Sequence, residues 1–222
     1  MGFAEDFFNA LVAYNEAVLP VTVVAFLVGV AAVGLAARPG RSSGRLIAVM
    51  LGGLWLWAGV VFLVLFFGPT DVELLGVTLP GVWYVSGVVF AAQGVLLLVY
   101  GVVRPSLSFR LTRSLYGVVG AVLVVYALIL YPLVGVVTGF SFPRYPVFGA
   151  PCPVVIFTWG FLLWADQKVP VPVALIPVLW AVMGLLPVLA LGVWADVGLI
   201  LAGVIGVPLL VRRNRALTHA GS

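Results

Sequence analysis

The chain has 222 residues, of which 64% are hydrophobic and 8% are charged, with a formal net charge of +4. Soluble domains carry about 25% charged residues, so this chain has too few to cover a globular surface, and lipid must be the solvent for most of it. The basic residues are spread over short segments and form no cluster, which excludes nucleic acid as a partner despite the positive net charge.

The N-terminal segment 3–15 is predicted to form an amphipathic helix. Its apolar side chains recur on one helical face, whereas Glu5, Asp6 and Asn9 lie off that face. A signal peptide is not expected, because the segment carries acids where a signal peptide carries bases. We expect the helix to lie at the membrane interface or to lead into the first span.

Seven apolar runs follow along the chain, at residues 17–37, 45–67, 82–103, 115–138, 145–165, 170–191 and 195–211. A helix needs about 20 such residues to cross ~30 Å of hydrocarbon. Because the runs are continuous and do not alternate polar with apolar residues, they predict helices and not the strands of a barrel. The expected fold is a single all-α polytopic domain with seven transmembrane helices.

The charges between the runs alternate in sign along the chain. One side receives ten of the eleven basic residues, namely Arg38, Arg41, Arg45, Arg104, Arg110, Arg113, Lys168, Arg212, Arg213 and Arg215. The other side receives six of the seven acids and a single base, Arg144. The positive-inside rule then predicts an outside N-terminus and a cytoplasmic C-terminus in a multi-pass protein of the cell membrane.

The first candidate site is Tyr14-Asn15-Glu16, which precedes Pro20. Proline has no N–H, so the carbonyl of Glu16 loses its helical hydrogen bond. The Glu16 carboxylate, the Asn15 amide and the freed carbonyl are expected near the outer mouth, as hard-oxygen ligands or a proton site. The alternative is an interfacial acid beside a helix kink.

Gln93 is the lone amide deep in the third span, and it is expected to bond a neighbouring helix, with a binding role as the alternative. Small residues at regular spacing predict packing seams, at Gly87, Gly94 and Gly101 in the third span and at Gly198, Ala202 and Gly206 in the seventh. In the fourth span, Tyr131 precedes Pro132, where a kink is expected. Asp196 is predicted to cap the N-terminus of the seventh helix.

The fifth run departs from the pattern of the others, because Pro146, Pro151 and Pro153 cannot lie inside a regular helix. Proline is favoured at the first helical position, so the helix is expected to run from Cys152 to Ala165. Fourteen residues span about 21 Å at 1.5 Å each. The fifth helix is therefore short or broken, and the irregular backbone before it must be buried in protein or line a wet cavity.

Cys152 is the main candidate for a reactive or binding residue. It is expected at a helix N-terminus, where the partial positive charge favours a thiolate. Arg144, eight residues upstream, would strengthen this effect. The alternative is an inert, buried cysteine, since free cysteines are among the most buried residues.

Absent features narrow the function further. No lysine lies within a predicted span, which excludes a retinal Schiff base, and the motifs of zinc proteases, serine hydrolases and nucleotide-binding proteins are missing. No chain of acids or histidines crosses the bilayer, which argues against a proton pump. With one thiol and no intramembrane histidine, no metal and no other cofactor is expected, and enzymatic activity is less expected than its absence.

Several stretches together carry a family resemblance: Tyr14-Asn15-Glu16 with Pro20, Leu54-Trp55-Leu56-Trp57, Tyr126 through Tyr131-Pro132, and Phe148-Gly149-Ala150-Pro151-Cys152-Pro153 running into Ile156-Phe157-Thr158. On these residues the chain resembles a family of multi-pass membrane proteins of unknown function from bacteria and archaea. The Gly-x-Pro-Cys-Pro element is the most specific part. The resemblance implies an integral membrane protein and supplies no substrate or catalytic residue.

Three hypotheses for function remain open. The first is binding or permeation of a small solute through an outward-facing site near Cys152 and Glu16, a transporter-like role. The second is a membrane anchor that uses the glycine seams to contact a further copy of the chain or a partner membrane protein. The third is a membrane-embedded enzyme with Cys152 as nucleophile, which needs a base within hydrogen-bond reach. In each case the bilayer is the surrounding partner.

Overall fold

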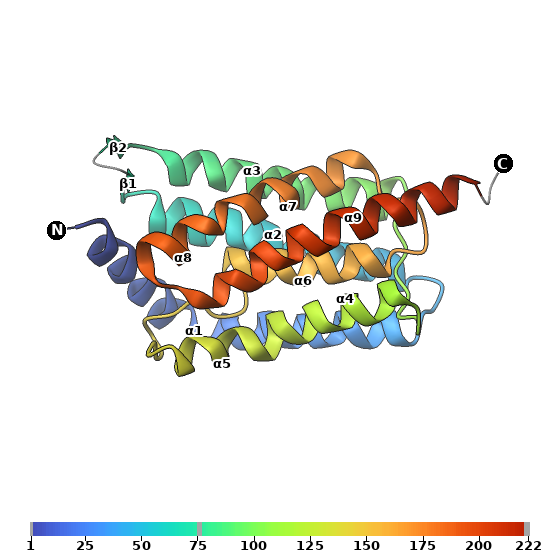
Figure 1. The fold of residues 1–222 in the computed structure, drawn as a ribbon, viewed down its shortest axis with the longest axis horizontal. Helices are drawn as coiled ribbons and strands as arrows, with labels where there is room; N and C mark the ends of the chain where they lie inside the picture. The colour runs from blue at the N-terminus through green and yellow to red at the C-terminus, as the bar shows by residue number, and fades with distance from the viewer. Residues whose placement is uncertain (1, 75–76, 220–222) are drawn as a thin grey trace.

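The computed structural model describes residues 2–74 and 77–219. Six helical segments in this part are long and apolar enough to cross a membrane: Phe3–Ala37, Ser43–Phe67, Val82–Val103, Leu115–Val137, Val171–Leu191 and Trp194–Thr218. A seventh apolar helix, Pro151–Trp164, is shorter. The helices form one elongated bundle with the two termini at opposite ends (Figure 1). The chain is therefore an all-α polytopic membrane protein.

In the described part of the chain the bundle has seven helical segments, and most of them contain more than one helical element. They are α1 (Phe3–Ala37), α2 (Ser43–Trp57) with the π-helix η1 (Ala58–Phe67), α3 (Val82–Leu98) with η2 (Val99–Val103), α4 (Leu115–Val125) with η3 (Tyr126–Leu130) and α5 (Tyr131–Val137), α6 (Pro151–Trp164), α7 (Val171–Met183) with α8 (Leu185–Leu191), and the 3₁₀ turn η4 (Trp194–Asp196) with α9 (Val197–His219). A hairpin of β1 (Val72–Leu74) and β2 (Val77–Leu79) joins η1 to α3.

The predicted amphipathic segment and the first span form one helix. Helix α1 has 35 residues and continues through Pro20. At 1.5 Å per residue it is about 52 Å long, well beyond ~30 Å of hydrocarbon. Of the two predicted arrangements for residues 3–15, the structure shows the one that leads into the span. Phe7, Phe8 and Leu11 of this part are buried against the bundle.

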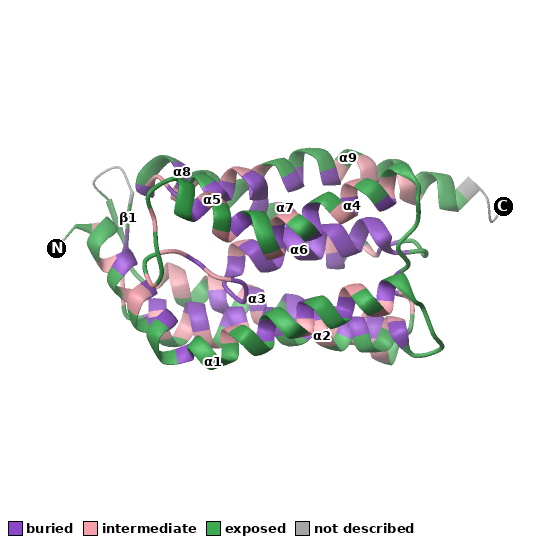
Figure 2. Cartoon of the chain, turned by 90° about the horizontal axis from the view of Figure 1, so that it is seen from below, coloured by how far each residue is buried: buried purple, intermediate pink, exposed green. Residues whose placement is uncertain are grey.

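Helix α6 lies at the centre of the bundle and confirms the prediction of a short fifth helix, with 14 residues from Pro151 to Trp164. Every residue of α6 except Cys152 is buried, which Figure 2 shows as a purple helix between helices with green outer faces. The contact with α4 is close, since a Cβ added at Gly160 would lie 2.7 Å from the carbonyl oxygen of Gly120. Trp55 of α2 donates from Nε1 to Thr158 Oγ1 at 2.9 Å.

Both predicted glycine seams form close contacts with other helices of the same chain. In the third span, a Cβ added at Gly87 or Gly94 would lie 2.8 Å from a carbonyl oxygen of the preceding segment. In the seventh span, a Cβ at Gly206 would lie 2.6 Å from the Trp159 ring, and Gly198 packs on the ring of Tyr126. These seams therefore bring helices of one chain together and leave no such surface free at these glycines.

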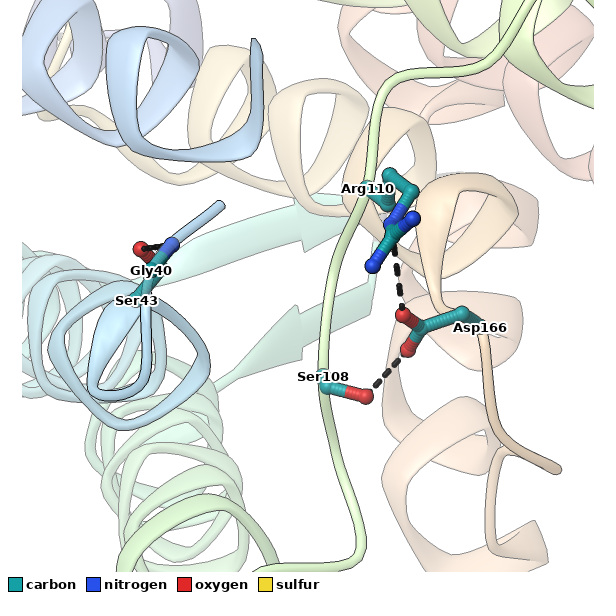
Figure 3. Close-up of polar contacts among 5 residues, drawn as sticks. All are labelled: Gly40, Ser43, Ser108, Arg110 and Asp166. Carbon is teal, nitrogen blue, oxygen red and sulfur yellow. Dashed lines mark hydrogen bonds and ion pairs between the residues drawn. The ribbon is translucent and has the colours of Figure 1, made fainter. Parts of the chain in front are cut away.

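Ten of the eleven basic residues lie in or beside the α1–α2, α3–α4 and α6–α7 connections and the C-terminal part of α9, and we call this end of the bundle the basic end. Polar contacts hold its short connections together (Figure 3). The segment between α3 and α4 passes the C-terminal end of α6, where the Arg110 amide donates to the Trp164 carbonyl at 2.8 Å. Asp166 accepts a hydrogen bond from Ser108, and one of its oxygens lies 4.0 Å from Arg110 Nε. In the α1–α2 connection, the Gly40 amide donates to Ser43 Oγ at 2.7 Å.

Candidate functional site

The candidate site is a small cavity at the end of the bundle opposite the basic connections. Its volume is about 50 Å³. Its wall comes from α1, η1, α3, the segment before α6, α6, the α7–α8 pair and the η4 turn, and comprises Phe7, Phe62, Leu63, Trp83, Pro146, Ala150, Pro151, Cys152, Trp180, Pro187, Val193 and Asp196. Asp196 is the one charged residue of this wall, and four of the others are aromatic.

Asp196 reaches the cavity because of the turn that precedes α9. Helix α8 is followed by Gly192, whose φ of +68° is in the left-handed region that favours glycine. The chain then reverses through η4, and Asp196 is the last residue before α9. The sequence predicted a helix cap here. The structure instead directs the carboxylate at α5, where Oδ1 accepts a hydrogen bond of 2.7 Å from Tyr131 Oη. Asp196 is 1% exposed.

Two tyrosines of the fourth span hold the turn in place. Tyr131 is fully buried and bonds the Asp196 side chain, while Tyr126 donates from Oη to the Ala195 carbonyl at 2.8 Å. Gly198 lies against the Tyr126 ring with no space for a side chain. The position of Asp196 is therefore fixed by one hydrogen bond to its side chain and by another to the backbone of the preceding residue.

Cys152 is the second residue of α6 and keeps part of its surface exposed to the cavity. Its thiol adjoins the Asp196 carboxyl, Tyr131 and Trp180. The neighbour of the thiol is thus an acid, and not Arg144 as the sequence suggested. A thiol, a carboxyl and a phenol from three separate segments meet at one point.

Asn15 is fully buried and positions the irregular segment that precedes α6. Its Nδ2 donates to the carbonyl oxygens of Pro143 and Tyr145, at 2.7 and 2.9 Å. Its Oδ1 has no partner among the described residues. The amide therefore holds backbone at membrane depth, where an unsatisfied carbonyl is costly.

Glu16 and Arg144 do not join Cys152 in the cavity, which corrects the expected pairing. Glu16 is exposed on α1 and is absent from the cavity wall. The reason is helical geometry: Tyr14 and Asn15 face the bundle, and the next residue is turned by about 100°. Arg144 is also exposed, with its guanidinium carbon 5.4 Å from the centre of the Phe8 ring.

A second, smaller cavity of about 10 Å³ links Arg144 to the site. Arg144 and Tyr131 both line it, and it shares Pro146 and Val193 with the cavity of Asp196. Tyr131 thus lies between the exposed arginine and the buried carboxylate. The two cavities therefore adjoin each other at Pro146 and Val193.

Gln93 lies away from this site and has the bonding role expected of it. It is fully buried, and its Nε2 donates to the carbonyl oxygen of Val173 at 2.8 Å. Pro177 lies four residues after Val173 in α7, so this carbonyl has no helical donor. The amide replaces the missing hydrogen bond across two helices.

Comparison with known proteins places the chain in a family. The model of a "Family of unknown function (DUF6064)" matches residues 4–220. The chain belongs to DUF6064. Searches of curated proteins and of solved structures gave no match. Membership of DUF6064 assigns no activity, so any activity has to be argued from the site itself.

The central residues of this DUF6064 site, Asp196 and Tyr131, were not predicted as site residues. Asp196 is the one acid that follows Asp166 in the sequence, within an otherwise apolar stretch. An isolated ionisable residue in such a stretch is a signal of function, but its place near a span boundary suggested a cap. Among the described residues, no group of three or more His, Cys, Asp or Glu side chains could hold a metal.

Proposed function

We propose that this protein binds a small cation of the ammonium class in the cavity of Asp196, with Cys152 and Tyr131 beside it. The observation that carries the proposal is a carboxylate that is 1% exposed and lines an aromatic cavity with no basic residue in its wall. This sharpens the predicted role of solute binding near Cys152.

The energetics of the carboxylate favour a cationic ligand. An ionised carboxyl group is costly in an apolar interior unless a positive charge compensates it. The Tyr131 hydroxyl supplies one hydrogen bond and no charge. Intramembrane acids are rare and mark ion or substrate sites. A bound monovalent cation would supply the missing charge.

The wall and the size of the cavity narrow the class of cation. Phe7, Phe62, Trp83 and Trp180 all line it, and aromatic faces attract desolvated cations by about 2 kcal/mol or more. The volume of about 50 Å³ exceeds the ~10–15 Å³ that a cavity needs to hold one water molecule. Methylammonium is a small cation of this class and serves as the probe of the site.

Binding is favoured over permeation in the conformation described. Between the cavity and the basic end, residues 153–165 of α6 and its C-terminal flank are buried. The Trp55–Thr158 hydrogen bond and the Gly120–Gly160 contact lie along this path. A solute that enters at Asp196 therefore meets packed side chains. The site is complete within one chain and needs no second copy.

The proposal includes an orientation. Ten of the eleven basic residues belong to the end that carries the C-terminus, and Arg144 belongs to the other. The positive-inside rule then supports a cytoplasmic C-terminus and a cavity that opens to the outside of the cell membrane.

A thiol enzyme is a second candidate, because Cys152 adjoins Asp196. A nucleophilic thiol needs a base within hydrogen-bond reach, and a carboxylate can serve as one. The anchor hypothesis has lost its main support, since both glycine seams are used within the chain.

Binding is tested on the purified full-length chain in nanodiscs by titration with methylammonium chloride, followed by tryptophan fluorescence, since Trp83 and Trp180 line the cavity. We expect saturable binding that Asp196→Asn weakens at least tenfold, because the amide removes the charge and keeps the shape. Glu16→Gln is the matched control, since Glu16 is an exposed acid at the same end and should not affect binding.

The accessibility of Cys152 gives an independent readout. The small cationic reagent 2-aminoethyl methanethiosulfonate, added from the outside, should modify Cys152, and methylammonium should slow the modification. Binding of acetate in place of methylammonium, or unchanged methylammonium binding in Asp196→Asn, would refute the cation site. Slow modification of Cys152 that methylammonium does not affect would count against a cavity that opens to the outside.

A further inference from the structure

We infer a second binding site, for an anionic phospholipid, in the groove between α7 and α9 on the lipid-facing side of the bundle. The two helices run side by side (Figure 1). Two adjoining cavities of about 190 and 340 Å³ lie between them and share Val178 and Val207. The site is distinct from the cavity of Asp196, since the two have no lining residue in common.

The walls of the groove follow one helical stripe on each side. On α7 and the start of α8 the lining residues are Val171, Ala174, Leu175, Val178, Ala181, Val182 and Leu185, and on α9 they are Ile200, Gly203, Val204, Val207, Leu210, Val211 and Asn214. The spacing of three and four residues keeps each stripe on one face. The 14 residue steps from Val171 to Leu185 extend about 21 Å, more than the ~15 Å of one hydrocarbon leaflet.

A basic residue lies at the same end of each stripe. On α9, Arg215 follows Val211 by four residues and continues the stripe beyond the groove, and in the connection before α7, Lys168 directly precedes Val169, which also lines the groove. Both side chains are exposed. Asn214 brings the two stripes together here, since it bonds both the amide and the carbonyl of Val169, at 3.1 and 3.0 Å.

The chemistry of the groove selects one occupant. Its length and apolar walls accept an acyl chain, while two lysine or arginine charges at the membrane surface attract a phosphate headgroup. The lining contains no acid. A zwitterionic lipid would fill the groove equally well but would gain less from Lys168 and Arg215. The groove is therefore selective for an anionic phospholipid of the leaflet at the basic end.

The test is native mass spectrometry of the purified full-length chain, incubated with phosphatidylglycerol or phosphatidylcholine of identical acyl chains. Wild type should retain phosphatidylglycerol preferentially. Lys168→Gln and Arg215→Gln should each lower its affinity about fivefold, and together they should remove the preference. Val178→Phe, which fills the groove, should lower retention of both lipids.

Matched controls separate a site from diffuse charge. Arg41→Gln with Arg113→Gln removes two exposed bases at the same end, and Val88→Phe alters a valine of α3 that is 67% exposed. Neither should change lipid retention. The inference is overturned if Arg41→Gln with Arg113→Gln lowers retention as much as the Lys168 and Arg215 pair does. It is also overturned if Val178→Phe has no effect, or if glycerol phosphate displaces the lipid at equal concentration, which would indicate a phosphate site without the groove.

Discussion

Asp166 and Asp196 lie at opposite ends of the bundle and have different surroundings. Asp166 follows α6 at the basic end, where its side chain is 40% exposed and pairs with an Arg110 side chain that is 60% exposed. Asp196 precedes α9 at the other end, where it is 1% exposed and accepts a hydrogen bond from Tyr131. One carboxylate is exposed to solvent and has a basic side chain beside it, whereas the other is buried in a wall without a basic side chain.

The difference shows at which end of the bundle a carboxylate lowers the stability of the fold. An exposed ion pair contributes about 0–1 kcal/mol, because water screens it and its side chains lose freedom. A carboxylate buried without a cation lowers stability, and such groups in membranes mark ligand or ion sites. The basic end is thus a solvated closure, whereas the Asp196 end retains a costly group beside a cavity.

Charge reversal gives the largest expected contrast between the two ends. Asp196→Lys should lower the unfolding free energy by about 3 kcal/mol or more, because an ammonium group would be buried beside the Cys152 thiol without a counter-ion. Asp166→Lys should change it by less than about 1 kcal/mol, since the site is exposed. Unfolding by SDS titration in mixed micelles measures both. Equal losses in the two variants would contradict the comparison.

Two tyrosine-to-phenylalanine substitutions test whether Asp196 is ionised. Tyr131→Phe removes a hydrogen bond to a carboxyl group and should cost about 1.5–3 kcal/mol if that group is ionised. Tyr126→Phe removes a bond to the neutral Ala195 carbonyl and should cost about 1 kcal/mol. The same unfolding measurement applies. Equal losses would show that Asp196 carries no charge in the empty site and ionises only with its ligand.

Local sequence rules predicted the shape of the bundle well. Proline positions predicted the short fifth helix, because three prolines at positions 146, 151 and 153 disfavour a regular helix there, although single prolines such as Pro20 lie inside helices of this chain. Apolar runs of about 20 residues gave the other six segments, because the bilayer fixes their length. The join between residues 3–15 and the first span was left open, because an amphipathic pattern fits a helix at the interface as well as one that leads into the span. The structure shows one continuous helix, α1.

The site could not be predicted in the same way, because it depends on which helix faces meet. Tyr131 and Asp196 are 65 residues apart, and no spacing rule relates them. Glu16 was expected in the site, but it is placed outside by the rotation of a single residue along α1. Gln93 was correctly expected to bond a neighbour, although Val173 as its partner follows only from the packing of α3 on α7.

Removal of the exposed ion pair at the basic end should have a small effect. Arg110→Gln should lower the unfolding free energy by less than about 1 kcal/mol, because the Arg110 amide still bonds the Trp164 carbonyl. The loss should shrink further in 1 M salt, where screening extends over only ~3 Å. A loss above about 2 kcal/mol would place Arg110 among the structural residues of the bundle and weaken the contrast with Asp196.

Arg144 gives the smallest expected effect, and its sign identifies the charge of the ligand. Its guanidinium is exposed and lines the outer cavity, so it would repel a cation on the way to Asp196, although water screens the repulsion. Arg144→Gln should therefore raise the affinity for methylammonium about twofold at low salt and leave it unchanged at high salt. An anionic ligand would show the opposite change. Because the substitution leaves the Asp196–Tyr131 pair intact, a decrease in methylammonium affinity at low salt would mean that the guanidinium supports the shape of the mouth, through its position over the Phe8 ring, more than it repels the ligand.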